Sequence, residues 1–101
     1  MPYIKRELRA QFDGEINALA NRIKRASELE GYDGAFAGFL DYCIFTLGAK
    51  VMPARRYWAM CMIVGVFRNA ADEFLRRVVD KYEDEKLIEN GDVLSDEILG
   101  K

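Results

Sequence analysis

The sequence predicts an all-α fold with three main helices, a long third helix, and a helical bundle that is completed by homodimerisation. Apolar residues recur at intervals of three and four along most of the chain, and no stretch sustains the period-two alternation of a half-exposed strand. The 101 residues are enough for one compact core. We therefore expect residues 1–101 to form a single helical domain, with 91–101 as a short tail that adds one turn after Ser95 or frays.

The first helical segment lies in the stretch RELRAQFDGEINALANRIKRASELE, where apolar residues draw one stripe along a helix. The members of the stripe are Leu8, Phe12, Ile16, Leu19 and Ile23. Asp13 followed by Gly14 is typical of a cap and a restart, so we expect a short helical turn over about 5–11 and a main helix over about 14–29.

The stretch EGYDGAFAG contains three glycines and separates this segment from the second helix. We expect the second helix over 34–49, with Asp33 as its N-cap and Gly48 as the glycine that ends it. Pro53 suits the first turn of the third helix. From residue 54 to residue 89 there is no proline and one glycine, Gly65. If the third helix is continuous through Gly65, it spans about 54 Å; the sequence leaves open whether it is.

Residues 57–67, YWAMCMIVGVF, are apolar on every side of the third helix, and such a helix has to be surrounded by other protein. Two short partner helices cannot surround it while their outer faces meet water, and monomers seldom expose so large an apolar patch. We therefore expect a homodimer with long helices paired across a two-fold axis; an N-terminal segment that wraps the open side is the alternative. The expected interface residues are Tyr57, Trp58, Met60, Cys61, Val64, Phe67 and, at the close crossing, Gly65.

Composition narrows the classes of function. The chain has no histidine, which excludes the common zinc sites and Ser-His-Asp or Cys-His catalysis. The net charge of −2 provides no field that recruits nucleic acid or an anionic membrane. The longest apolar run is shorter than a membrane span, and MPYIKRELRA lacks the apolar region of a signal peptide. We therefore expect a cytoplasmic protein without a cofactor, in which Cys43 and Cys61 are small buried core residues.

Residues 80–97 contain eight acidic residues and two lysines, and acids near a helix C-terminus oppose the helix dipole. A solvated helix face is the simplest interpretation of this stretch. The functional interpretation, which we adopt, is a surface for a protein partner. The expected partner surface consists of Tyr82, Glu83, Asp84, Glu85 and Lys86. Upstream of it, we expect Asp72 to pair with Arg76, and Glu73 with Arg77.

The same carboxylates permit a second hypothesis, a Mg²⁺-dependent phosphohydrolase. Mg²⁺ is held by one or two carboxylates together with substrate phosphates, and all-α nucleotide pyrophosphohydrolases take such carboxylates from two facing helices. The second helix offers one acidic residue here, so the sequence favours a non-enzymatic role over an enzymatic one. The candidate metal ligands are Asp41, Glu73, Asp80, Glu83 and Asp84.

A third hypothesis is weak binding to nucleic acid, which requires several cationic side chains on one surface. Basic residues cluster in NRIKR and PARR. Two of them are expected at the start of the third helix, where the helix dipole disfavours cations, so an anion or an acidic side chain of a second subunit is expected beside them. The candidate residues are Arg22, Lys24, Arg25, Arg55 and Arg56.

The opening MPYIK and the run EFLRRVVDKYEDEKLIENGDV, residues 73–93, resemble a family of short uncharacterised proteins in prokaryotic and bacteriophage genomes. The resemblance covers about a quarter of the chain strongly and the first helix loosely. It implies a cytosolic origin and a phage or prophage context. The resemblance implies no chemistry, so no catalytic residue is carried over. The preferred function is a small interaction or accessory protein that acts as a dimeric helical bundle.

Overall fold

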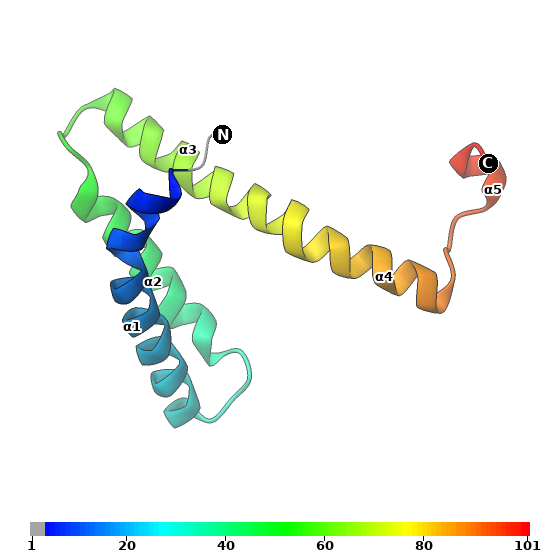
Figure 1. The fold of residues 1–101 in the computed structure, drawn as a ribbon, viewed down its shortest axis with the longest axis horizontal. Coiled ribbons are helices and arrows are strands. Elements are labelled where there is room, and N and C mark those ends of the chain that lie inside the picture. The colour runs from blue at the N-terminus through cyan, green and yellow to red at the C-terminus, as the bar shows by residue number, and fades with distance from the viewer. Residues whose placement is uncertain (1–3) are drawn as a thin grey trace. The chain divides into compact units, whose positions relative to one another are not determined.

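The structure is a computed structural model that describes residues 4–101; the first three residues of the MPYIK motif lie outside the described part. The described residues form helices and no strand, which confirms the all-α prediction. The elements are α1 (Arg6–Glu30), α2 (Ala35–Val51), α3 (Tyr57–Phe74), the π-helical turn η1 (Leu75–Val79), α4 (Asp80–Asn90) and α5 (Asp96–Leu99) (Figure 1).

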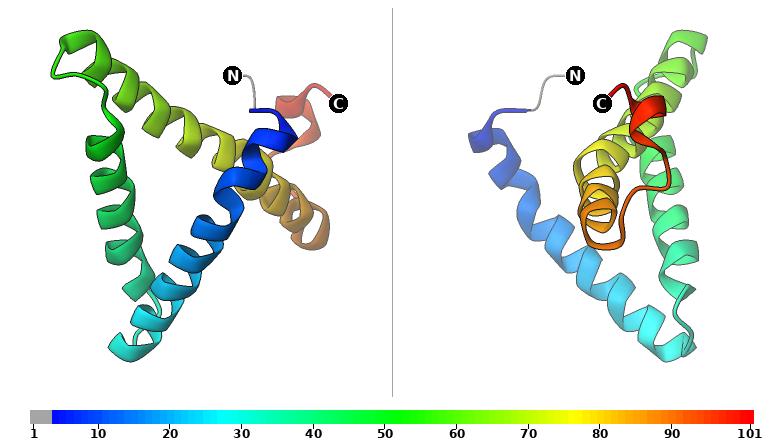
Figure 2. Two further views of the ribbon diagram at one scale, coloured as in Figure 1. Left: turned by 60° about the vertical axis from the view of Figure 1, so that its left-hand side comes forward. Right: turned by 90° about the vertical axis from the view of Figure 1, so that its right-hand side faces the viewer.

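The chain divides into two units, Met1–Ile63 and Val64–Lys101. In the first unit, α1 and α2 pack together beside the loop that joins them and separate with distance from it (Figure 2). Burial follows this geometry. Ile23 and Phe39 are half-buried and Ala35 is buried near the loop, whereas Phe12 near the other end of α1 is exposed. The α1–α2 pair therefore covers only part of the apolar stripe of α1.

The predicted interruption of α1 at Asp13 and Gly14 is wrong, because α1 is helical without a break from Arg6 to Glu30. A glycine within a helix costs about 1 kcal/mol relative to alanine, which the helical sequence on both sides outweighs. The helix ends at Gly31, whose φ of 77° is in the left-handed region that favours glycine. The backbone N–H of Gly31 donates to the carbonyl of Ser27 at 3.4 Å.

Both predicted ends of the second helix require correction. Gly34, rather than Asp33, is the N-cap of α2, and no side chain caps it. Gly48 is buried inside α2, and the helix continues to Val51. The stop comes from Pro53, because a residue that precedes proline is disfavoured in the α region. Met52 accordingly has a ψ of 120°.

The third helix begins at Tyr57, three residues later than predicted. A start at Ala54 would place two arginines in the first turn, beside the positive end of the helix dipole. Instead, the N–H of Arg56 donates to the carbonyl of Ala54 in a non-helical connection. From Tyr57 to Asn90 the 34 residues are helical throughout, Gly65 included, which confirms the long third helix.

The second unit contains most of this long helix and the short α5. The helix ends at Gly91, whose φ is 83° and whose N–H donates to the carbonyl of Leu87. Ser95 then caps α5 by accepting a hydrogen bond from the N–H of Ile98 at 3.4 Å, so the predicted extra turn after Ser95 is present. No residue of this unit is buried. A single helical run has no second long element against which to bury its apolar face.

Candidate functional site

The start of α3 presents the residues that were predicted as a dimer interface. Ala59 is 1% exposed and Ile63 is half-buried, whereas Tyr57 is 82% exposed and Trp58 is 56% exposed. Met60, Cys61 and Val64 are exposed, Phe67 is half-buried, and a Cβ added at Gly65 would meet no atom within 4 Å. One side of this apolar segment, at Ala59 and Ile63, is therefore covered, Phe67 is partly covered, and most of its other residues stay open.

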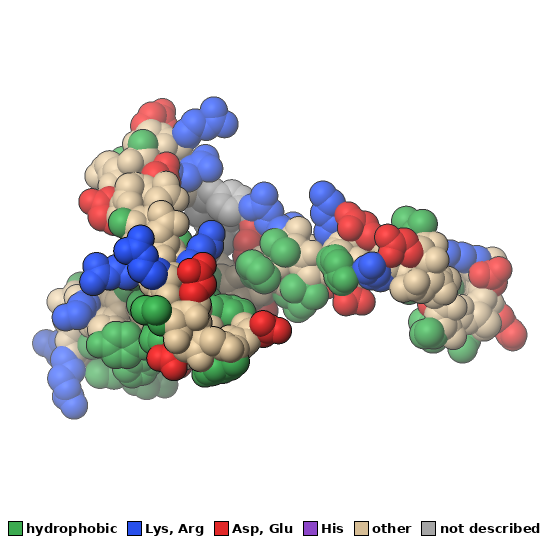
Figure 3. Space-filling model, turned by 90° about the horizontal axis from the view of Figure 1, so that it is seen from below, with side chains coloured by type: hydrophobic (Ala, Val, Ile, Leu, Met, Phe, Trp, Pro, Cys, Tyr) green, Lys and Arg blue, Asp and Glu red, His purple; other side chains and the backbone are tan. Residues whose placement is uncertain are grey.

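Large apolar side chains also lie exposed elsewhere on the described surface, between charged ones (Figure 3). The stripe of α1 is an example, since Leu8, Phe12, Ile16 and Leu19 are all exposed. The prediction that both cysteines are buried is wrong. Cys61 is exposed, Cys43 is half-buried, and both are free thiols. The sequence pattern marks apolar faces correctly, but it does not distinguish a face that its own chain covers from one that stays open.

The acidic partner surface lies on α4. Tyr82, Glu83, Asp84 and Glu85 are exposed, whereas Lys86 is half-buried. The Nζ atom of Lys86 lies 2.8 Å from Oε2 of Glu89 and 5.4 Å from the centre of the Tyr82 ring. Lys86, one of the two lysines of α4, is therefore paired with Glu89, one of the acids of the same helix. The last turn of α4 contains no basic residue, so the acids there add to the negative end of the helix.

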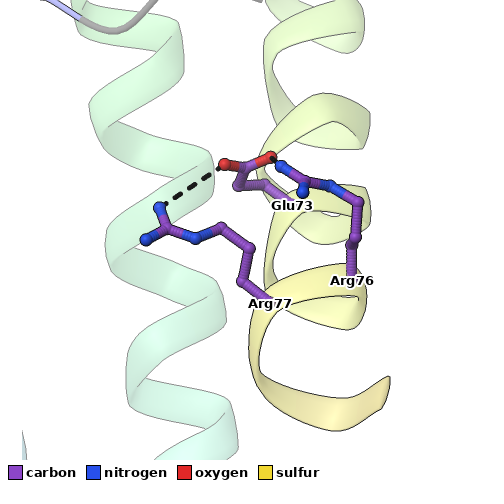
Figure 4. Close-up of polar contacts among 3 residues, drawn as sticks. All are labelled: Glu73, Arg76 and Arg77. Atoms are coloured by element: carbon purple, nitrogen blue, oxygen red, sulfur yellow. Dashed lines mark hydrogen bonds and ion pairs between the residues drawn. The ribbon is translucent and has the colours of Figure 1, made fainter. Parts of the chain in front are cut away.

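Glu73 is the centre of a small ion-pair group at the π-helical turn (Figure 4). Its Oε2 accepts a hydrogen bond from the guanidinium of Arg76 at 2.8 Å, and its Oε1 lies 3.6 Å from that of Arg77. The predicted pair of Glu73 and Arg77 is confirmed. Arg76 pairs with Glu73 at i,i+3 rather than with Asp72 at i,i+4, and both spacings bring side chains together on a helix.

Two members of this group, Glu73 and Arg77, also line an open pocket of about 400 Å³ on the second unit. Its other walls are apolar, from Ala70, Phe74 and Val78. The side chain of Glu73 is 35% exposed, and its Oε1 atom is shielded from solvent. The pocket thus combines an apolar floor with one carboxylate that is paired with two arginines.

Glu73 should titrate below its ordinary pKa. The hydrogen bond from Arg76 is the main cause that lowers the pKa from 4.5, and the charges of both arginines add to it. Because the folded pKa is lowered, the stabilisation is present above pH 4.5 and is lost as the pH falls through the lower folded value. A carboxyl ¹³C NMR titration should give a midpoint below 4.5, which Arg76→Ala moves back towards 4.5. A midpoint that Arg76→Ala leaves unchanged would contradict this assignment.

The candidate metal ligands do not form a metal site in the described structure. Asp41 lies exposed on α2 of the first unit, whereas the other four candidates lie on α3 and α4 of the second. Within residues 4–101, no group of three or more acidic or cysteine side chains is arranged to hold a metal ion. Glu73 is moreover engaged by two arginines. The spacing of acids along one helix could not reveal this, since metal binding needs donors that converge from different directions.

The candidate nucleic-acid residues all lie in the first unit. Arg22 and Arg25 line an open groove of about 420 Å³ on α1, together with Ala18, Asn21, Ala26 and Leu29. Lys24 is exposed on the same helix, and Arg55 and Arg56 are exposed in the connection between α2 and α3. The prediction that these two arginines lie inside the first turn of the third helix is wrong, because α3 begins after them.

In the part of the chain that the structure describes, no helix is both long enough and apolar enough to cross a membrane. Neither a curated protein nor a solved structure matches the chain. One family model does match, and it covers residues 1–93, a range that includes both the opening MPYIK and the closing ENGDV. The chain therefore belongs to the family described as domain of unknown function DUF6899.

Proposed function

We propose that this chain is a small interaction protein that acts as a dimer, in the cytoplasm of a prokaryotic or phage-infected cell. The long helix supplies the dimer contact, and the acidic end of α4 binds a partner macromolecule. One observation carries the proposal: from Val64 to Tyr82, the apolar face of the long helix is largely exposed. Phe74 is 61% exposed, and Val64, Val78 and Tyr82 are each about half exposed.

Burial within each unit supports a second copy. In the first unit, the buried residues are Ala35, Gly48 and Ala59, and none of them has a side chain larger than a methyl group. In the second unit no residue is buried. Burial of large apolar side chains is the main favourable contribution to folding, so a chain with half of its residues apolar needs another surface to cover them. A second copy of the same chain supplies such a surface.

The acidic end of α4 supports the choice of partner. Residues 80–90 contain five acids and two lysines, which gives a net charge of −3. One lysine is already paired with Glu89, and the exposed acids at 83–85 have no ion pair among the described residues. A basic surface on a protein partner is the complement of this charge. The two free thiols agree with a reducing compartment such as the cytoplasm.

The partner contact can be tested by capture from a lysate of the native cell. A Glu83→Lys/Asp84→Lys variant should capture about tenfold less of the partner than the unchanged chain does, because the charge that complements the partner is reversed. The matched control is Glu15→Lys/Glu28→Lys, which reverses two exposed acids on α1 and should retain the partner. Equal loss in both variants, or capture that high salt leaves unchanged, would contradict the role of the acidic end.

A further inference from the structure

The apolar stripe of the long helix is nearly symmetric about Ala71. It consists of Met60, Val64, Phe67, Ala71, Phe74, Val78 and Tyr82. The spacings are four, three and four before Ala71 and three, four and four after it, so each helical turn contributes one member. Val64 and Val78 each lie seven residues from Ala71, and Met60 and Tyr82 each lie eleven residues away. Because of this symmetry, the stripe of one chain can lie along the stripe of a second chain that runs in the opposite direction, with matching residues opposite each other.

Charge along the same stretch has opposite signs at the two ends. Residues 55–68 contain three arginines and no acid, for a charge of +3, whereas residues 80–90 have a charge of −3. Parallel pairing of two copies would place like charges beside each other at both ends. Antiparallel pairing about Ala71 places residues 80–85 of one copy opposite residues 57–62 of the other, the start of α3, which Arg55 and Arg56 directly precede. Opposite charges at this spacing select the antiparallel orientation.

The area of the stripe is close to what a small dimer interface needs. An aromatic side chain buries roughly 150–250 Å². Phe74 and Tyr82 are more than half exposed, Phe67 is half-buried, and Met60 and the two valines are smaller, so the stripe supplies on the order of 400–500 Å² per copy. Leu75, which is 51% exposed, flanks the stripe and extends it. Two copies together therefore approach the area of about 1,200 Å² at which specific interfaces begin.

We propose that two copies of the chain pair antiparallel along this helix, with Ala71 beside the two-fold axis. The proposal rests on the proposed function and specifies its dimer. It moves the close crossing from Gly65, where the sequence alone placed it, to Ala71, because spacing and charge are both symmetric about Ala71. The methyl side chain of Ala71 allows two helices to approach closely. Tyr82 becomes part of the dimer contact, whereas Asp84, about 200° further round the helix, stays open for the partner.

Distances between identical spin labels in the dimer test this register. In a background in which Cys43→Ala and Cys61→Ser leave no native thiol, Asp72→Cys and Lys81→Cys place labels on two exposed positions of the helix. In the antiparallel pair, the two labels at position 72 are offset by about 3 Å along the axis and those at 81 by about 30 Å. Pulsed EPR should therefore give a short distance at 72 and a much longer one at 81. Dilution with unlabelled chain should remove both distances.

The possible outcomes separate this proposal from the proposed function. Equal short distances at both positions would mean parallel pairing and would overturn the antiparallel register while a dimer remains. A long distance at 72 as well as at 81 would place the axis elsewhere and would also overturn it. If neither position gives a distance between subunits and the particle has the mass of one chain, both proposals fail.

Discussion

Phe74→Asp separates the dimer into single chains. Phe74 is 61% exposed and lies three residues from the proposed axis, so both copies bury this side chain in the contact. Burial of one phenylalanine contributes about 1.5–3 kcal/mol, and the two-fold axis applies the loss twice. We expect the dissociation constant to rise by roughly a hundredfold to ten-thousandfold. Sedimentation equilibrium measures this change directly.

The matched control for this variant is Ile88→Asp. Ile88 is an apolar residue of the same helical run, is 85% exposed, and lies off the stripe. The same change in chemistry should leave the dissociation constant within a few-fold of the unchanged chain, because an open surface position loses no buried contact. If Phe74→Asp and Ile88→Asp weaken the dimer equally, the stripe is not the dimer contact.

Ala59→Leu destabilises the first unit. Ala59 is 1% exposed at the start of α3, so the added carbon atoms of leucine have no space unless neighbouring residues move. Overpacking of this kind costs about 1–3 kcal/mol. For a domain of this size, the loss corresponds to a decrease in Tm of about 4–20 °C. Thermal unfolding followed by circular dichroism at a fixed protein concentration gives the value.

Ala10→Leu controls for the effect of leucine itself. Ala10 is an exposed residue of α1, and alanine and leucine both favour helices. We therefore expect Ala10→Leu to change Tm by no more than a few degrees. A decrease as large as that of Ala59→Leu would show that the burial of Ala59 does not determine the result.

The sequence predicts the helices well because helix periodicity is a local property. The apolar spacing identifies the long third helix, and this helix ends at Asn90, directly before the predicted tail of residues 91–101. The errors in the predicted bounds of the helices fall where two local sequence signals compete. The sequence predicts a helix restart at Gly14 and a helix end at Gly48, yet both residues lie inside helices. A glycine that stays in the α region does not stop a helix by itself. Pro53 determines the end of α2 because it restricts its neighbour sterically.

The π-helical turn at Leu75–Val79 had no signal in the sequence, since its residues fit an ordinary helix equally well. Helix spacing likewise does not decide between the two acids within reach of Arg76, which are Asp72 at i,i+4 and Glu73 at i,i+3. The candidate metal site also could not be judged from the spacing of residues along one helix. The acidic and apolar faces of the long helix follow from spacing, but the convergence of carboxylates on a metal depends on how separate helices are placed. Periodicity within one helix contains no information about that placement.

The mass of the particle in solution at micromolar concentration shows whether two copies of the chain pair. We expect sedimentation equilibrium of the unchanged chain to give twice the chain mass of 11.6 kDa, because the stripe of the long helix is covered by a second copy. A single species of 11.6 kDa across the same concentration range would contradict the account. In that case the exposed face of the long helix would have to be covered by the rest of its own chain.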